Sequence, residues 1–280
     1  MDDYLILVDS SCDISDEMKK DMPLEVVPIN LTIDNSDYID DGSIDLDEFL
    51  DKMANSKDGP KTSAPAPGLF MQHFEKAETI FIICISKEIS SSYNNALIAK
   101  EMYLENHPEK HIEVIDSRSA SVALALLAIN LDQKLKNEVP IEKAVSEVRQ
   151  YAHKMTTLFV LNDLSNLLKS GRITHLSKIF ASILNIKPLM GSDGKGGIGL
   201  VKKVRGYKRA INDMLDSIGE TPMLELKDKV LGIAYCKAPD EAKEFAKEVK
   251  KRYPFMQVHI TAMRATISVY ANIKGLLIAY

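Results

Sequence analysis

Two segments of the chain concentrate hydroxyl side chains just before a helical pattern. Residues 61–68 place Thr62 and Ser63 ahead of a proline-stiffened turn, and residues 86–92 contain four serines after an apolar run. Hydroxyls at such a junction accept hydrogen bonds from the free N–H groups of the helix, and these N–H groups with the helix dipole also favour an anion. Each segment is therefore typical of a helix cap or of a carboxylate or phosphate site, and taken alone each favours the cap.

Asp9 begins a third polar segment, residues 9–13, directly after the first apolar run. Open α/β sheets bind ligands at the carboxyl ends of their strands, so Asp9 is a candidate nucleophile or ligand contact. A phosphoaspartate hydrolase would carry a second carboxylate two residues later, where this chain has Ser11. A strand-end carboxylate that caps the following turn is an equally good interpretation, and both stay open.

Other chemical signatures are incomplete. Residues 194–199 satisfy the G-x-G-x-x-G spacing, but a strand-like segment follows where a dinucleotide site needs a helix, so we expect a hairpin tip. Residues 37–48 match part of a calcium-binding EF loop, but Ile39 occupies a ligand position, and Asp45 with Glu48 fits a capping box. The six histidines and three cysteines lack metal-ligand spacing. We therefore expect neither a metal nor another cofactor.

Composition narrows the classes of protein further. The chain has 280 residues, of which 45% are hydrophobic and 27% charged, as in globular proteins. Its 35 basic and 40 acidic side chains leave no cationic excess for phosphates, so nucleic acid is not an expected partner. The acidic N-terminus has no signal-peptide pattern, and the longest uncharged stretch, residues 119–131, is too short to span a membrane. A cytoplasmic location is expected.

Apolar runs and helical patterns alternate along the first half of the chain. The runs that predict buried strands are residues 4–8, 26–33, 79–85, 112–115 and 157–161. The helical patterns between them are residues 46–53, 69–77, 93–104, 121–135 and 141–153. This alternation predicts an α/β domain with a mostly parallel sheet.

The second half has a different order of elements. Helical patterns at residues 164–168 and 176–186 precede a glycine-rich loop, residues 191–197, whose flanks predict a hairpin. Helices predicted at residues 207–218, at residues 239–251 and in the C-terminal residues surround strand candidates at residues 230–235 and 257–262. We expect two domains, residues 1–155 (α/β) and 156–280 (α+β), packed through an extensive interface.

The short motifs, taken together and in order, resemble the DegV family. The segments that carry the resemblance are residues 8–11, 61–65, 85–93, 116–121, 168–174, 186–188 and 203–205. The resemblance implies a cytoplasmic bacterial protein that binds one long-chain fatty acid, such as palmitate, in a tunnel between two domains and is not itself an enzyme. Some members are the acyl-carrier subunit of a fatty acid kinase, so a separate ATP-dependent kinase is the implied protein partner.

The resemblance also implies which side chains hold the fatty acid. Carried over by motif position, Thr62 and Ser90 bind the carboxylate, with Ser63 and Ser92 as neighbouring candidates. The family usually has a histidine where this chain has Tyr270. A tyrosine donates one hydrogen bond but supplies neither a second ring nitrogen nor a positive charge, which weakens the kinase-substrate role more than lipid binding.

A basic set and three apolar segments complete the candidate site. Arg172, Lys187 and Arg205 are candidates for contact with an acyl phosphate, the kinase or anionic lipid head groups at a membrane surface, and ordinary exposed charge is the alternative. The tunnel walls are expected from residues 161–168, 176–186 and 260–277. Two other functions stay open: a phosphotransferase or hydrolase that uses Asp9 on a small molecule, and an interaction module without a ligand.

Overall fold

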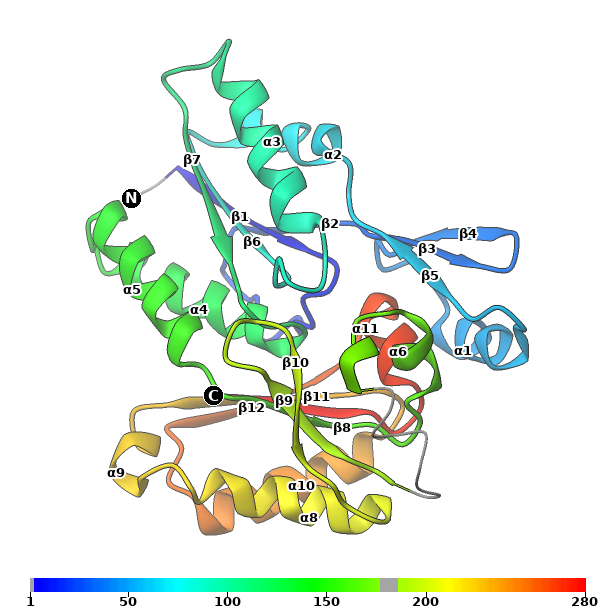
Figure 1. The fold of residues 1–280 in the computed structure, drawn as a ribbon. Helices are drawn as coiled ribbons and strands as arrows, with labels where there is room; N and C mark the ends of the chain where they lie inside the picture. Colours follow the sequence, from blue (N-terminus) through cyan, green and yellow to red (C-terminus); the bar gives the residue numbers. More distant parts are fainter. Residues whose placement is uncertain (1–2, 177–185) are drawn as a thin grey trace.

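The computed structural model describes residues 3–176 and 186–280 of the chain. Its strands form a four-stranded, a six-stranded and a three-stranded sheet (Figure 1). The four-stranded sheet is parallel, in the order β2-β1-β6-β7. Its strands are β1 (Tyr4–Asp9), β2 (Leu24–Val27), β6 (Thr79–Cys84) and β7 (His111–Asp116). The α/β organisation predicted for the first half of the chain is confirmed, except that the apolar run at residues 157–161 belongs to the six-stranded sheet, where it is antiparallel to its neighbours.

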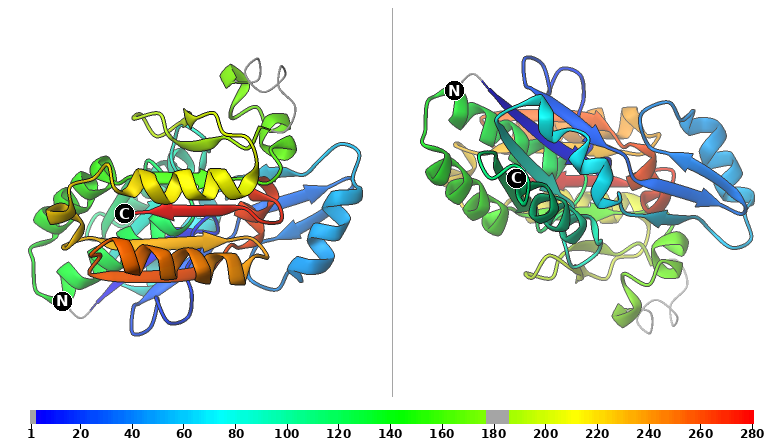
Figure 2. Two further views of the ribbon diagram at one scale, coloured as in Figure 1. Left: turned by 90° about the horizontal axis from the view of Figure 1, so that it is seen from below. Right: turned by 90° about the horizontal axis from the view of Figure 1, so that it is seen from above.

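The six-stranded sheet is mixed, in the order β10-β9-β8-β13-β11-β12. Its strands are β8 (Thr157–Val160), β9 (Leu189–Ser192), β10 (Ile198–Lys202), β11 (Val230–Tyr235), β12 (Gln257–Ala262) and β13 (Leu276–Ala279). Viewed from below in Figure 2, α8 (Tyr207–Ile218) and α10 (Pro239–Arg252) lie side by side over its outer face, and α9 (Met223–Leu226) follows α8. The predicted α+β organisation of the second half is confirmed, and so is the hairpin of β9 and β10.

The three-stranded sheet, in the order β4-β3-β5, is antiparallel. It consists of β3 (Asn30–Ile33), β4 (Ser36–Ile39) and β5 (Lys61–Ser63), and α1 (Leu46–Asn55) lies between β4 and β5 in the chain. The Asp45 side chain accepts hydrogen bonds from the N–H groups of Asp47, at 2.9 Å, and Glu48, at 3.1 Å. Asp45 is therefore the helix cap that the sequence predicts.

One helix lies between the two large sheets. On one face of the parallel sheet are α2 (Pro67–Met71), the 3₁₀ turn η1 (Phe74–Lys76) and α3 (Ser92–Leu104), and on the other are α4 (Val122–Lys136) and α5 (Ile141–Lys154). The α4 helix also contacts β11 and β13 of the six-stranded sheet. Because sheets cover both of its sides, α4 is apolar around most of its circumference. Within the described ranges, no helix has the length and apolar content needed to cross a bilayer.

Several predicted element boundaries are wrong. The strand predicted at residues 26–33 is split between β2 and β3, because Pro28 has no N–H to donate to a ladder. The helix predicted at residues 69–77 is only α2 followed by η1. The C-terminal residues form α11 (Ala265–Ala271) and then β13, since a short apolar run fits a buried strand as well as a helix. The helix predicted at residues 176–186 lies, apart from its two end residues, outside the described residues.

Candidate functional site

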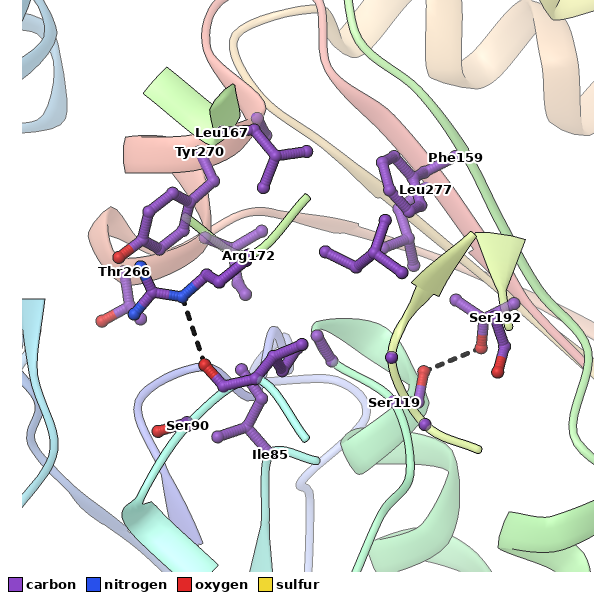
Figure 3. Close-up of a pocket in the computed structure, with 18 of the residues that line it drawn as sticks. Ile85, Ser90, Ser119, Phe159, Leu167, Arg172, Ser192, Thr266, Tyr270 and Leu277 are labelled. Atoms are coloured by element: carbon purple, nitrogen blue, oxygen red, sulfur yellow. Dashed lines mark hydrogen bonds between the residues drawn. The ribbon is translucent and has the colours of Figure 1, made fainter. Parts of the chain in front are cut away.

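A pocket lies between the loops at the carboxyl end of the parallel sheet and the six-stranded sheet (Figure 3). Its walls come from both halves of the chain and are mostly apolar. Side chains that form them include Ile85, Phe159, Leu161, Leu167, Ile267 and Leu277. Leu161 and Leu167 belong to one predicted wall segment, and Ile267 and Leu277 to another. Such walls suit a hydrocarbon chain better than a sugar or a nucleotide.

At one end of the pocket, three polar side chains meet. The hydroxyl oxygens of Thr62 and Tyr270 lie 2.6 Å apart. The guanidinium Nη2 of Arg172 donates to Thr62 Oγ1 at 3.3 Å, and the guanidinium carbon lies 4.8 Å from the centre of the Tyr270 ring. We call Thr62, Tyr270 and Arg172 the head group cluster. It brings one positive charge and two hydroxyls to the edge of an apolar cavity.

Each member of the head group cluster is placed by a different element. Thr62 is the middle residue of β5, opposite Leu31 of β3, and Tyr270 lies on α11. Arg172 follows α6 (Ser165–Lys169), and its Nε donates to the carbonyl oxygen of Ile89 at 3.1 Å. Burial raises the pKa of Tyr270, while the Arg172 charge and the Thr62 hydrogen bond act in the opposite direction. The phenol is therefore protonated at neutral pH and can donate to an anion.

Ser90 lines the pocket beside this cluster, in the loop between β6 and α3. Its Oγ accepts a hydrogen bond from the Ser92 N–H at 3.2 Å, and its own N–H donates to the carbonyl oxygen of Ser86. No hydrogen bond within residues 3–176 and 186–280 uses the Ser90 hydroxyl proton, which can therefore donate to a ligand. Ser91, next to it, also lines the pocket.

Asp9 holds the Ser90 loop in place without reaching the pocket. The carboxylate is fully buried and accepts from Ile85 N at 2.9 Å, from Ser92 Oγ at 2.6 Å, and from both the N–H and the hydroxyl of Ser11. Burial raises the pKa of Asp9, and these hydrogen bonds counteract the rise. A phosphotransferase or hydrolase would need a carboxylate that a substrate can reach, and the position of Asp9 does not support that interpretation.

The other candidates from the sequence lie outside the pocket lining. Ser92 is fully buried, and its hydroxyl donates a hydrogen bond to Asp9. Ser63 is exposed, because successive side chains of β5 point to opposite faces and Thr62 takes the pocket face. Lys187 donates to the carbonyl oxygen of Asn162, and Arg205 is exposed on the surface. The structure therefore brings together Thr62, Ser90, Tyr270 and Arg172.

A buried polar network fixes the start of α11, which carries Tyr270. Asp13 Oδ1 accepts from the Arg264 N–H at 2.6 Å, and Asp13 Oδ2 accepts from Ser121 Oγ at 2.5 Å. Asp40 accepts from both the N–H and the hydroxyl of Thr266, at 2.9 and 2.6 Å. Burial is the main reason that the pKa of Asp13 is raised to about 8. Two carboxylates of the first half of the chain thus position a pocket helix of the second half.

Sequence reasoning missed the polar residues at the opposite end of the pocket. Ser119 and Ser192 line it there, and Thr157, whose hydroxyl oxygen lies 2.7 Å from that of Ser119, lines it beside them. Ser119 lies in the motif at residues 116–121, so a sequence signal existed for it, whereas Thr157 and Ser192 lie in strand and hairpin patterns that give none. Among residues 3–176 and 186–280, no group of three or more His, Cys, Asp or Glu side chains could hold a metal ion.

Comparison with known proteins gives matches over nearly the entire chain. A family model described as "Uncharacterised protein, DegV family" matches residues 4–279. A DegV domain-containing protein of Streptococcus pyogenes serotype M1 is 30% identical over 279 residues, which are 99% of each chain.

Solved structures with the same fold are also found. A DegV family protein of Ruminococcus gnavus, whose structure is described with vaccenic acid, is 36% identical with a TM-score of 0.94 and 99% of each chain covered. The Fatty Acid Kinase (Fak) B3 protein of Streptococcus pneumoniae, loaded with linoleic acid, is 27% identical with a TM-score of 0.90 and the same coverage.

Proposed function

This chain belongs to the DegV family, and we propose that it binds a long-chain fatty acid in the pocket between its two large sheets. The observation that carries the proposal is an apolar cavity that ends in the head group cluster of Thr62, Tyr270 and Arg172. The fatty acids described with the Ruminococcus gnavus and Streptococcus pneumoniae structures support it.

Burial of the acyl chain supplies most of the binding free energy. Each buried methylene contributes about 0.8 kcal/mol, so a sixteen-carbon chain gains on the order of 12 kcal/mol before the costs of association. A buried carboxylate without partners would cost several kcal/mol. The Arg172 charge and the hydroxyls of Thr62, Ser90 and Tyr270 offset that cost, so the carboxylate is expected at this end.

Extraction of the purified protein under denaturing conditions, followed by mass spectrometry, tests the proposal directly. We expect one long-chain fatty acid per chain, and saturable binding of a fluorescent fatty acid after delipidation. Absence of both would overturn the proposal. Bound lipid of another class, such as an intact phospholipid, would also contradict it, because the head group cluster provides for one carboxylate.

We further infer that the protein carries its fatty acid to a fatty acid kinase in the cytoplasm, with brief contact at a membrane surface when the lipid is loaded. The similarity to the Fak B3 protein supports a carrier role. Arg172 at the pocket edge, with Lys187 and Arg205 outside it, are the proposed contacts for the acyl phosphate or the kinase.

A reconstituted assay with a bacterial fatty acid kinase and ATP separates the carrier role from lipid binding. We expect acyl phosphate to form only when this protein is loaded. Arg205→Glu reverses an exposed charge that is not part of the lining, so it should lower the kinase rate and leave the fatty acid Kd unchanged. Lipid binding without phosphorylation by any kinase tested would remove the carrier role and keep the binding function.

A further inference from the structure

The pocket has a second polar end, which we call the far end and define by Ser119, Thr157 and Ser192. In Figure 3, Ser119 and Ser192 lie across the cavity from Tyr270. The walls between the two ends are apolar. A fatty acid whose carboxylate lies at the head group cluster therefore points the end of its hydrocarbon chain toward three hydroxyls.

These hydroxyls have unused hydrogen-bonding capacity. The oxygens of Ser119 and Thr157 lie 2.7 Å apart, so one of their two protons is shared between them and the other is free to donate. Ser192 Oγ accepts from the Gly194 N–H at 3.1 Å and keeps its own proton. Within the part of the chain that the structure describes, the three hydroxyls have no other side-chain hydrogen bonds. A methyl group at the end of an acyl chain cannot pair with any of them.

Contacts between the two halves of the chain hold the far end in shape. Arg118 Nη2 donates to the carbonyl oxygen of Gly194, at the tip of the β9-β10 hairpin, at 2.7 Å. Gly196, with φ of +104°, packs so closely that a Cβ there would lie 2.6 Å from Ser86 Oγ. The hairpin that carries Ser192 is thus docked against the loops of the parallel sheet. The three hydroxyls are held near one another before a ligand binds, which lowers the entropic cost of binding.

We propose that the far end binds a hydroxyl group at the end of the acyl chain, so that the protein prefers ω-hydroxy long-chain fatty acids to unsubstituted ones of the same length. A ligand hydroxyl both donates and accepts, which matches a side-chain pair that has a free proton and free lone pairs. The inference rests on the proposed function, because it assumes that the carboxylate occupies the other end.

Competition binding with paired ligands tests the inference. Saturated fatty acids of 12, 14, 16 and 18 carbons are each compared with the ω-hydroxy acid of the same length on the delipidated full chain. Thr157 is buried, Ser119 half-buried and Ser192 exposed, so the hydrogen bond is expected at the Ser119 and Thr157 pair. For at least one length, we expect the hydroxy acid to bind about 5- to 10-fold more tightly, as one additional hydrogen bond there allows. In an apolar far end the order would be reversed, because the hydroxyl would lose its water without gaining a partner.

Four variants separate the far end from the head group cluster. In Ser119→Ala or Thr157→Val the remaining hydroxyl of the pair can still bond to the ligand, so each single variant should reduce the preference only in part, and the double variant should abolish it. Thr261→Val is the matched control, because Thr261 is a buried threonine of the same sheet that does not line the pocket. This control should keep the preference, and thermal unfolding verifies that all four variants are folded.

The outcomes distinguish the inference from the function on which it rests. If neither type of acid binds, the proposed function fails and the inference falls with it. If unsubstituted acids bind and hydroxy acids have no advantage at any length, only the inference is overturned. An advantage that survives in the double variant Ser119→Ala/Thr157→Val also overturns it, because the hydroxyl would then be recognised elsewhere.

Discussion

The hydroxyl oxygens of Thr62 and Tyr270 lie 2.6 Å apart, although 208 residues separate them in the chain. Thr62 Oγ1 also receives a hydrogen bond from Arg172, so the pair and the guanidinium form one connected group. Two hydroxyls that share one hydrogen bond have one proton left between them, and either oxygen can present it. A carboxylate at this end of the pocket is therefore expected to accept one hydrogen bond from the pair, donated by either Thr62 or Tyr270.

Removal of the two hydroxyls should have more than a multiplicative effect on fatty acid binding. In Tyr270→Phe the Thr62 hydroxyl still donates to the carboxylate, and in Thr62→Val the Tyr270 hydroxyl still donates to it. Each single variant should therefore bind the fatty acid only about threefold more weakly than the wild type. The double variant has lost both hydroxyl donors of the pair and should bind about 30-fold more weakly. Isothermal titration calorimetry of the four proteins completes the double-mutant cycle.

Tyr207→Phe is the control for the tyrosine substitution. The Tyr207 hydroxyl donates to the carbonyl oxygen of Lys274 at 2.6 Å, and the residue does not line the pocket. This variant should bind fatty acid like the wild type. If the losses of the two single variants simply multiply in the double variant, the hydroxyls act independently and the expectation of one hydrogen bond from the pair is wrong.

Arg172 should determine how fatty acid binding depends on pH. A nearby positive charge lowers the pKa of a carboxyl group, so the bound acid is expected to be ionised and the Kd to be nearly constant from pH 6 to about 8 in the wild type. Arg172→Gln removes the charge, and binding at pH 8 should weaken about tenfold or more. The loss should shrink toward about pH 5, where a free carboxylic acid becomes neutral.

Arg252→Gln is the matched control, because Arg252 forms exposed ion pairs with Asp216 and Glu248 on the outer side of the molecule. It should leave the pH profile of binding unchanged. Equal losses for Arg172→Gln at pH 5 and pH 8 would show that Arg172 acts by packing against Tyr270 and not by its charge.

The sequence allows much of this fold to be predicted, because the central parallel strands contain long apolar runs and the long helices have clear spacing. The structure confirms the strands predicted from such runs as β1 and β6, and β7 forms where predicted although Glu113 interrupts its apolar residues. Elements that depend on tertiary pairing cannot be recognised from local sequence patterns. The β5 strand has three residues, two of them exposed, and only its pairing with β3 makes it a strand.

In the candidate site, too, some residues can be predicted from local motifs and others depend on tertiary packing. Thr62 and Ser90 belong to motifs whose order along the chain points to them, whereas for Arg172 the sequence indicates only a contact with a phosphate, a partner protein or a lipid head group. Its contact with Thr62 depends on how α6 packs, which no local pattern reveals. Thr157 looks like any strand residue, and only the approach of β8 to the loop after β7 pairs it with Ser119.

Asp9→Asn should destabilise the protein without removing a catalytic group. The buried carboxylate accepts four hydrogen bonds, and an asparagine would direct its NH₂ at some of the same donors. We expect a loss of about 3 kcal/mol in the free energy of unfolding, measured with urea. The folded variant should still bind fatty acid, because Asp9 is not part of the lining.

Asp45→Asn is the control for this substitution. Asp45 also accepts two backbone N–H groups, but it is exposed at the start of α1, where asparagine caps a helix equally well. Its effect should stay below about 0.5 kcal/mol. If Asp9→Asn is as mild as the control, the Asp9 carboxylate does not organise the Ser90 loop.

Asp13 should make the protein less stable as the pH rises from about 4 to 8. Its pKa is raised from 3.8 to about 8, mainly by burial, with Asp40 adding to the rise and Arg264 opposing it. Between these two pKa values the folded state holds a proton that the unfolded state has released, so the stability contributed by this group is fully present below the lower value and is lost toward the higher one. The free energy of unfolding then falls by at most about 1.4 kcal/mol per pH unit.

Asp13→Asn removes the titrating group and tests this expectation. Urea unfolding at pH 5, 6, 7 and 8 should show a weaker dependence of the free energy of unfolding on pH for the variant than for the wild type. Parallel profiles would mean that the Asp13 carboxylate is ionised throughout, held in that form by the Arg264 N–H and the Ser121 hydroxyl.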